Sequence, residues 1–508
     1  MKLHLGNLRF LRNSLYMGLA FSLLASSGEL LADNHGKSAP VTPSPPIQPP
    51  SPLPSPLPNQ QPSPATAVDA KNYRLNRLDN GLEIVTFASS KVPLVTFVLV
   101  FRAGAMSETP ETNGLTHLWE HMFFKGNARL PKQEDFVRRV RQLGISYNGD
   151  TSAEMVRYYF TLPSVHLEDG MRFMADAIRT AKLDEKELEK ERVVVLNEYE
   201  RNASDPGFES RTLRRLVRYG DLAYLRDPLG TKQIILSASV KQLETIQNDV
   251  FVPANGALMI SGDFKTERVL ALAKTYFGTW KNPKDWKAPI RPSFAPMKES
   301  KEIISTHKSF ENASITHSFS GPLVGENPKD TYAADFLSGL LSHKQNQFYK
   351  TFVESGLTFG AQCSYHTQAK AGEIYLSAET LPQNMLKVKD LLLAEIPKWT
   401  HESYFTKEQF EDVRTGIEIS RLKETATPSA YIKELAFWWA VPTFSYYDSY
   451  NDELKKLSFK DIKDYVEKWL LNKPHLTTGL INQAEATKIG IKDTGTELAD
   501  KLLKSYRE

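Results

Sequence analysis

Two histidines and a glutamate in the segment NGLTHLWEHMFFKGN have the residue types and the spacing of a metal-dependent hydrolytic site. His117, Glu120 and His121 form the pattern H-x-x-E-H. On a helix, residues four apart project from one face, so both imidazoles can reach the same cation. Glu120 lies beside them and can face that cation without filling a ligand position. The pattern therefore predicts a zinc site with a carboxylate next to it.

A third ligand must come from another part of the chain. The candidate is the helical segment EKERVVVLNEYER, in which Glu191 and Glu198 are two turns apart and share a face. The valines between them indicate that part of this helix is buried, and a buried carboxylate needs a partner such as a metal. The alternative is a surface helix whose glutamates pair with neighbouring lysines and arginines.

The elements around these residues follow from hydrophobic periodicity and turn signals. Residues 115–124 have a helical pattern for which Asn113 is a suitable N-cap. Residues 94–101 are rich in β-branched and aromatic types, which predicts a buried strand. Asn80-Gly81 lies between two apolar stretches and predicts a hairpin. We also expect helices at 133–143, 165–181 and 185–201, and strands at 158–162 and 257–261.

The second half of the chain repeats this order of elements. Strands are expected at 302–308 and 314–319, helices at 330–341 and 345–353, strands at 359–366 and 373–378, and then several helices. Strands mixed with helices and given twice predict an α+β fold with two domains of similar build. The joint lies at 286–294, where two prolines interrupt the pattern. We therefore expect a catalytic domain at 71–290 and a homologous domain without the metal motif at 291–508.

Three segments together resemble one family of enzymes. These are FRAGAMSETPETNGLTH, the H-x-x-E-H pattern itself, and the pattern E-R-x-V-x-x-x-E from Glu191 to Glu198. They resemble the pitrilysin or insulinase family of inverzincin metallopeptidases, which includes mitochondrial processing peptidases and bacterial periplasmic members. Gly262-Asp263-Phe264 is also similar to the end of the family's catalytic domain. The resemblance covers residues 73–508.

The resemblance implies a fold and a chemistry. Each domain would be a mostly antiparallel sheet packed with helices, and the domains would form a clam-like chamber that admits peptides or unfolded polypeptide segments. Glu198 would be the third ligand of one zinc ion per chain, and Glu191 would orient the site from outside the ligand shell. Such a site keeps an open position for water, from which Glu120 would take a proton as the catalytic base. The chain is thus expected to be a zinc metalloendopeptidase.

Two further features concern the substrate. Asn148, in YNGDTSAEMVRYY, matches an asparagine near the family's site and would bind the substrate backbone; the alternative is an ordinary Asn-Gly turn. The strand at 158–162 could pair with an extended peptide by β-addition.

The second domain departs from the family pattern. Many members have an arginine and a tyrosine in a stretch resembling L-R-x-x-x-G-L-x-Y, but here the stretch is FYKTFVESGLTFGAQ. Phe359 takes the tyrosine position, and the arginine position falls at Phe352 or Val353. Either a homologous subunit without zinc supplies these groups, or the chain works alone or as a homodimer. A non-catalytic scaffold or assembly subunit is the alternative function, although such relatives usually lose the catalytic residues that this chain keeps.

Composition narrows the function classes. The 63 basic residues are balanced by 60 acidic ones, so the net charge of +3 does not indicate nucleic-acid binding. The single cysteine, Cys363, excludes an internal disulfide and a thiolate zinc cluster.

The N-terminal region indicates export. Lys2, Arg9 and Arg12 precede a ten-residue apolar run at 15–24, which is typical of a signal peptide within residues 1–32, with an uncleaved membrane anchor as the alternative. Twelve of the 30 prolines then lie between Pro40 and Pro64, so residues 33–70 are expected to form a disordered linker. The folded body is expected to work in the periplasm or otherwise outside the cytoplasm.

Overall fold

The computed structural model describes residues 73–441 and 443–502. The predicted signal peptide and proline-rich linker lie outside the described residues. No helix in the described ranges combines the length and the apolar character needed to cross a membrane.

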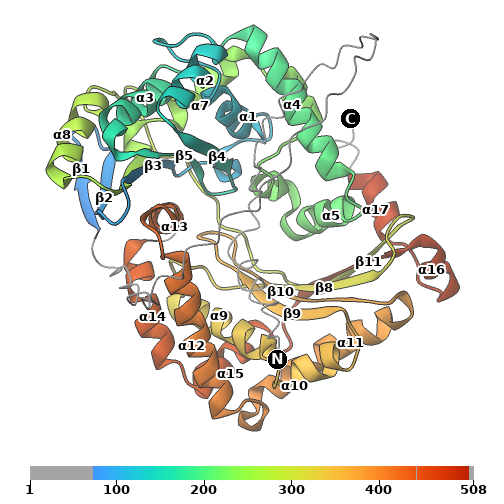
Figure 1. Cartoon of the computed structure of the whole chain (residues 1–508). Coiled ribbons are helices and arrows are strands. Elements are labelled where there is room, and N and C mark those ends of the chain that lie inside the picture. Colours follow the sequence, from blue (N-terminus) through green and yellow to red (C-terminus); the bar gives the residue numbers. More distant parts are fainter. Residues whose placement is uncertain (1–72, 442, 503–508) are drawn as a thin grey trace, which may run out of the picture.

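The first half of the described chain is built on a six-stranded sheet in the order β1-β2-β6-β3-β5-β4 (Figure 1). All neighbouring strands are antiparallel except β2 and β6, which are parallel. The strands are β1 (Arg74–Arg77), β2 (Glu83–Ala88), β3 (Leu94–Phe101), β4 (Ser146–Thr151), β5 (Val156–Pro163) and β6 (Gly256–Gly262). The hairpin at Asn80-Gly81 and the buried strand at 94–101 are confirmed.

The second half is built on a five-stranded sheet in the order β7-β11-β8-β10-β9. Its strands are β7 (Lys301–His307), β8 (Ala313–Ser320), β9 (Gly360–His366), β10 (Glu373–Thr380) and β11 (His475–Asn482). Apart from β1, this order repeats that of the first sheet strand for strand, including the one parallel pair, here β7 and β11. The predicted α+β fold with two homologous domains is thus confirmed. The limits 71–290 and 291–508 stay a prediction.

Helices surround both sheets. In the first half they are α1 (Leu115–Phe123), α2 (Gln133–Gln142), α3 (Leu167–Arg179), α4 (Glu185–Ala203), α5 (Phe208–Tyr219), α6 (Lys232–Ser237), α7 (Val240–Asp249) and α8 (Thr266–Phe277). In the second half they are α9 (Pro328–Ser342), α10 (Gln347–Tyr349), α11 (Met385–Glu395), α12 (Lys407–Glu424), α13 (Pro428–Ala440), α14 (Phe444–Lys456), α15 (Phe459–Trp469), α16 (Gln483–Lys488) and α17 (Gly495–Leu502). The helix predicted at 345–353 is present: it begins as α10 at Gln347 and continues without a break as a π-helical segment at Lys350–Glu354.

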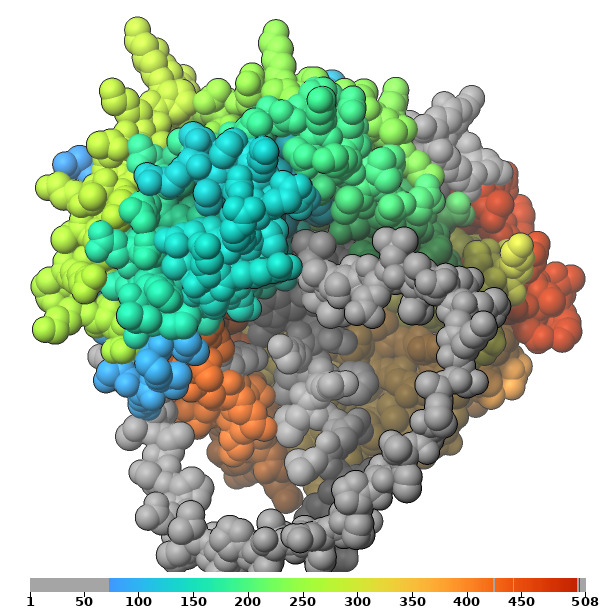
Figure 2. All heavy atoms as spheres, turned by 45° about the horizontal axis from the view of Figure 1, so that its top comes forward, coloured from blue at the N-terminus to red at the C-terminus, as the bar shows by residue number. Residues whose placement is uncertain are grey.

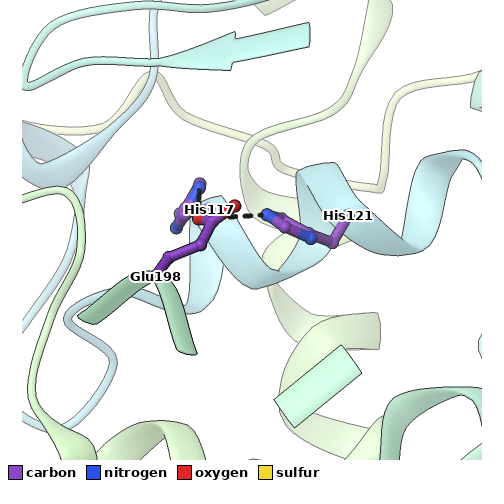
Figure 3. Close-up of side chains that lie close together, drawn as sticks. All are labelled: His117, His121 and Glu198. Atoms are coloured by element: carbon purple, nitrogen blue, oxygen red, sulfur yellow. Dashed lines mark ion pairs between the residues drawn. The ribbon is translucent and has the colours of Figure 1, made fainter. Parts of the chain in front are cut away.

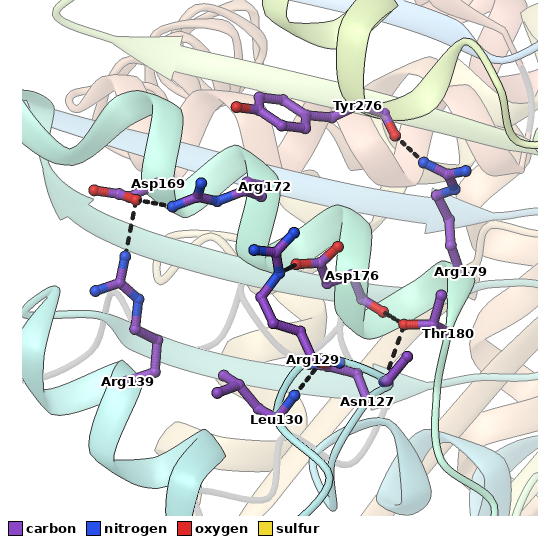
Figure 4. A network of polar contacts seen from close by, with 11 residues as sticks. Asn127, Arg129, Leu130, Arg139, Asp169, Arg172, Asp176, Arg179, Thr180 and Tyr276 are labelled. Atoms are coloured by element: carbon purple, nitrogen blue, oxygen red, sulfur yellow. Dashed lines mark hydrogen bonds and ion pairs between the residues drawn. The ribbon is translucent and has the colours of Figure 1, made fainter.

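Polar contacts hold α3 against its neighbours on the surface of the first half (Figure 4). Asp169 accepts hydrogen bonds from Arg139 of α2 at 2.8 Å and from Arg172 of α3 at 2.5 Å. Arg129 pairs with Asp176 at 2.8 Å, which ties the loop after α1 to the same helix. These pairs are partly exposed, so each contributes little stability and mainly fixes the orientation of the helix.

The two halves pack directly against each other. Helix α13 of the second half contacts β3 and β6 of the first, and α17 lies beside α5 (Figure 1). At this contact the Arg102 guanidinium lies 3.8 Å from the ring centroid of Trp439 and donates to its carbonyl oxygen. The Tyr219 hydroxyl donates to buried Glu373 at 2.7 Å. Figure 2 shows the blue-to-yellow first half above the orange and red second half in another orientation.

Candidate metal centre

Helix α1 carries the H-x-x-E-H residues, and aromatic packing fixes its opposite face. Trp119 stacks on Phe251 with ring centroids 3.9 Å apart, and Phe123 stacks on Tyr158 at 4.1 Å. Because these residues anchor one side of the helix in the core, the other side must face α4 and β4, which α1 also contacts. Local helical geometry and core packing together therefore present the motif to those two elements.

The N-cap of α1 differs from the prediction. The N-cap residue is Gly114, with φ of 95°, and Asn113 lies one position earlier. Asn113 is buried, and its side-chain amide donates to the carbonyl oxygens of Tyr224 at 3.1 Å and Asp227 at 2.8 Å. Asn113 therefore links the start of α1 to a distant loop and does not cap the helix.

Helix α4 brings the predicted third ligand to the two histidines. It begins at a well-formed cap, since the Asp184 carboxylate accepts from the backbone N–H groups of Lys186 and Glu187. Glu198 then reaches from α4 to both rings on α1 (Figure 3). Its Oε2 atom lies 3.7 Å from Nε2 of His117 and 3.7 Å from Nε2 of His121. The three ligand atoms all lie within 4.8 Å of one another.

The three side chains fit a zinc ion. Ligand atoms about 2.1 Å from a tetrahedral zinc lie about 3.4 Å apart, which is close to the two distances from Glu198. Two imidazole nitrogens and one carboxylate oxygen form a donor set that zinc accepts. Oε2 of Glu198 is buried, and among the described residues it has no hydrogen-bond partner. Such an atom is costly to bury unless a cation compensates it.

The protonation of His117 also suits a ligand. Burial, together with the charge of His121, lowers the pKa of His117 to about 3. The imidazole is therefore neutral at physiological pH, which is the form that binds metals.

Glu191 and Lys125 extend the site behind His121. Oε2 of Glu191 lies 3.1 Å from Nδ1 of His121, and Nζ of Lys125 lies 2.6 Å from Oε1 of the same carboxylate. Burial alone would raise the pKa of Glu191, but the hydrogen bonds from His121 and Lys125 hold it below its ordinary value. An ionised carboxylate fixes the His121 ring so that Nε2 faces Glu198. No sequence pattern indicated a role for Lys125, although it lies one turn after His121 on the same face of the helix.

Glu120 faces the same pocket without joining the ligand set. The Thr151 hydroxyl of β4 donates to Oε2 of Glu120 at 2.7 Å, and both residues line a pocket with the three candidate ligands. Burial, with smaller contributions from Asp150 and Glu198, raises the pKa of Glu120 to about 7. The arrangement leaves Oε1 as the oxygen that can exchange a proton in the pocket.

Gly149 has no side chain, and this leaves space for the carboxylate of Glu120. A Cβ atom at this position would lie 2.6 Å from Oε1 of Glu120 and 3.1 Å from its Cδ and Cγ atoms. We expect Gly149→Ala to displace the carboxylate and reduce kcat by about 10²-fold, while zinc content stays unchanged because no ligand moves. Peptidase assays with elemental analysis measure both. Gly360→Ala is the matched control in β9, where a Cβ atom meets nothing within 4 Å; an unaltered kcat in Gly149→Ala would contradict the packing argument.

The strand that borders the pocket is β4, for which the sequence shows no clear strand pattern. Asn148 lies within β4 and lines the pocket, so the alternative of an Asn-Gly turn is wrong. The expected β-addition at 158–162 is also wrong, because β5 pairs with β3 on one side and β4 on the other. Within the described residues, β4 is one of the two edge strands of the sheet, at the opposite end from β1. Pro228 and Leu229 form another wall of the pocket that no sequence signal indicated.

The second half offers no polar group at the positions of the missing arginine and tyrosine. Phe352 is fully buried and packs on Phe348 at 4.8 Å, and Val353 is partly buried. Phe359 is 59% exposed just before β9.

Cys363 is buried, which raises the pKa of its thiol to about 12 and makes it a poor nucleophile.

Comparison with known proteins identifies the family. The family model described as insulinase (peptidase family M16) matches residues 83–219, and the model described as the peptidase M16 inactive domain matches residues 237–417. The chain belongs to the M16 peptidase family. The H-x-x-E-H helix and Glu198 lie in the part that matches the first of these models, as the sequence resemblance predicted.

Relatives of this M16 chain include bacterial zinc proteases. It is 26% identical to the uncharacterized zinc protease YmxG of Bacillus subtilis over 290 residues, which covers 57% of this chain and 68% of YmxG. It is 23% identical to the zinc protease PqqE of Helicobacter pylori over 303 residues, covering 59% and 68%. The β subunit of the mitochondrial processing peptidase of Rattus norvegicus is 29% identical over 221 residues, covering 43% of this chain and 44% of that subunit.

Solved structures share the fold. A protease from Helicobacter pylori superposes with a TM-score of 0.74 at 18% identity, covering 80% of this chain and 99% of the other. The periplasmic protease PqqL from Escherichia coli gives a TM-score of 0.70 at 18% identity, covering 85% of this chain and 50% of PqqL. The clam-like M16 fold expected from the resemblance is thus confirmed.

Proposed function

We propose that the chain is a zinc-dependent endopeptidase that hydrolyses peptides or unfolded polypeptide segments. One observation supports this most: three ligand atoms from His117, His121 and Glu198 meet in a pocket that Glu120 also lines. One zinc ion bound there would act as a Lewis acid toward a peptide carbonyl and make water more acidic. The family membership supports the same conclusion, since relatives are named zinc proteases.

Residues around the proposed zinc ion would then transfer the proton and hold the groups of the site in place. Oε1 of Glu120 would take a proton from the attacking water and later deliver it to the nitrogen of the leaving amine. The hydrogen bond from Thr151 to Oε2 would keep the carboxylate in that orientation. Glu191 and Lys125 would hold the ring of His121.

We propose that the substrate lies along β4, next to Asn148. The edge of β4 can pair with an extended peptide through backbone hydrogen bonds. Asn148→Ala should raise KM about fivefold with a smaller effect on kcat, because one hydrogen bond contributes about 1 kcal/mol. Ser146→Ala is the control, since this residue is exposed on the same strand and does not line the pocket. Steady-state kinetics with a fluorogenic peptide decide the point: an unchanged KM in Asn148→Ala would contradict this placement.

We further propose that a homologous subunit without zinc completes the site, with a homodimer as the alternative. The proposal is supported by the apolar residues Phe352, Val353 and Phe359 at positions where many family members have polar groups.

Purified protein tests the partner proposal. The chain alone should bind one zinc ion but cleave peptides slowly, and a homologue with the arginine and tyrosine should raise kcat/KM by about 10²-fold, the usual cost of one missing transition-state donor. Light scattering during gel filtration distinguishes a mixed dimer from a homodimer. A fully active monomer would contradict both.

A further inference from the structure

Glu108 lies before α1, outside the ligand set, and its carboxylate is buried against the start of that helix. The residue is 6% exposed. Oε2 accepts from the backbone N–H of Gly114 at 2.9 Å and from the side-chain amide of Asn113 at 3.1 Å. Oε1 accepts from the backbone N–H of Thr116 at 2.8 Å. One carboxylate thus receives three hydrogen bonds, from Asn113, Gly114 and Thr116.

These contacts replace an ordinary helix cap. The first N–H groups of a helix have no partner within the helix, and Gly114 has no side chain that could accept from them. Glu108 accepts from two backbone N–H groups at this end, and its negative charge is favourable beside the positive end of the helix dipole. The carboxylate therefore fixes the first turn of α1 both in its position along the helix axis and in its rotation about that axis.

The same group fixes a wall of the metal pocket. Asn113, which donates to Glu108, also donates to the carbonyl oxygens of Tyr224 and Asp227. The backbones meet closely here, since a Cβ atom on Gly114 would lie 2.8 Å from the carbonyl oxygen of Leu229. Because Pro228 and Leu229 line the pocket, Glu108 determines how the helix and this loop sit relative to each other.

The ring position of His117 depends more on the contacts of Glu108 with the start of α1 than the ring position of His121 does. The ring of His121 is held by Glu191, whereas Nδ1 of His117 is buried and makes no hydrogen bond with any part of the chain that the structure describes. The position of its ring is therefore set mainly by the backbone of α1, and Thr116, whose N–H binds Glu108, is the residue immediately before it.

We propose that Glu108 is a positioning residue for His117: its buried carboxylate holds the first turn of α1, and thereby the His117 ring, in the place that metal binding requires. The inference rests on the proposed zinc site. In Glu108→Gln the amide nitrogen would turn a donor toward the N–H groups and the charge would be lost. Glu108→Asp keeps the charge on a shorter side chain. Glu111→Gln is the matched control, because Glu111 is exposed three residues later.

The test measures metal binding, apart from turnover. We expect Glu108→Gln to weaken zinc binding about tenfold or more in a chelator competition and to change the visible spectrum of the cobalt(II)-loaded protein. Glu108→Asp should recover part of the affinity, and Glu111→Gln should match the wild type. Amide hydrogen exchange at 113–123 in metal-free protein should be faster in Glu108→Gln.

The outcomes separate the two proposals. A wild-type chain that binds neither zinc nor cobalt would refute the proposed function and this inference with it. If the wild type binds both metals and Glu108→Gln keeps the same affinity and spectrum, only this inference is wrong, even if the variant melts at a lower temperature. If Glu108→Gln does not fold, the same measurements on Glu108→Asp decide: wild-type affinity and spectrum would overturn the inference, and weaker binding with an altered spectrum would support it.

Discussion

Replacing Glu120 with glutamine is expected to reduce kcat for peptide cleavage by about 10²–10⁴-fold, while zinc binding and folding stay intact. The range is what a positioned general acid-base contributes. Glutamine has the same shape and can still accept the hydrogen bond from Thr151, so the pocket keeps its packing. It cannot take a proton from water, and catalysis loses the group that transfers it.

The measurement is steady-state cleavage of a peptide library together with zinc analysis of the same preparations. Glu134→Gln is the control, because this glutamate is exposed in the first turn of α2. Unchanged cleavage by Glu120→Gln would exclude this residue as the base. Loss of zinc along with activity would show instead that Glu120 belongs to the ligand set.

Removing Glu198, the proposed third ligand, is the second substitution for which we expect a large effect, here on zinc affinity. Glu198→Ala leaves only two imidazoles for the metal, so we expect zinc affinity to fall by more than about 100-fold, beyond what loss of an outer-shell partner costs. Zinc should dialyse away and peptidase activity should be lost with it. Circular dichroism should be unchanged, since the buried Oε2 of Glu198 makes no hydrogen bond to any described residue and its removal relieves a desolvation cost.

Elemental analysis after dialysis gives the zinc content of each variant. Glu189→Ala is the control on the same helix, because Glu189 is exposed and faces away from the pocket lining. A Glu198→Ala variant that retains one zinc ion per chain would contradict the proposed ligand set.

The sequence was most informative where the chemistry is local. His117, Glu120 and His121 lie within little more than one helical turn, so their common face follows from helix geometry alone. The strand at 94–101 and the hairpin at Asn80-Gly81 also follow from short-range rules and are confirmed. The repeated order of elements predicted two similar domains, and the matching strand orders of the two sheets bear this out.

The errors arose where local patterns compete with distant contacts. Asn113 has the residue type and the position expected of an N-cap. Its side-chain amide instead donates to Glu108 and to carbonyl groups in the segment after α5, and Gly114 is the N-cap residue. Residues 158–162 have the pattern of a strand, but no periodicity reveals that β5 has neighbours on both sides. Strand order depends on how the whole sheet assembles.

The sequence by itself was enough to predict an M16 fold with two homologous domains and a zinc site at His117, His121 and Glu198. Only the tertiary structure decided which groups surround that site: Thr151 and Gly149 at Glu120, Lys125 behind Glu191, and Glu108 at the start of α1. The physical reason is that ligand spacing on a helix is set by bonds within the helix. The partners of each ligand are set by hydrogen bonds and packing between segments far apart in the chain.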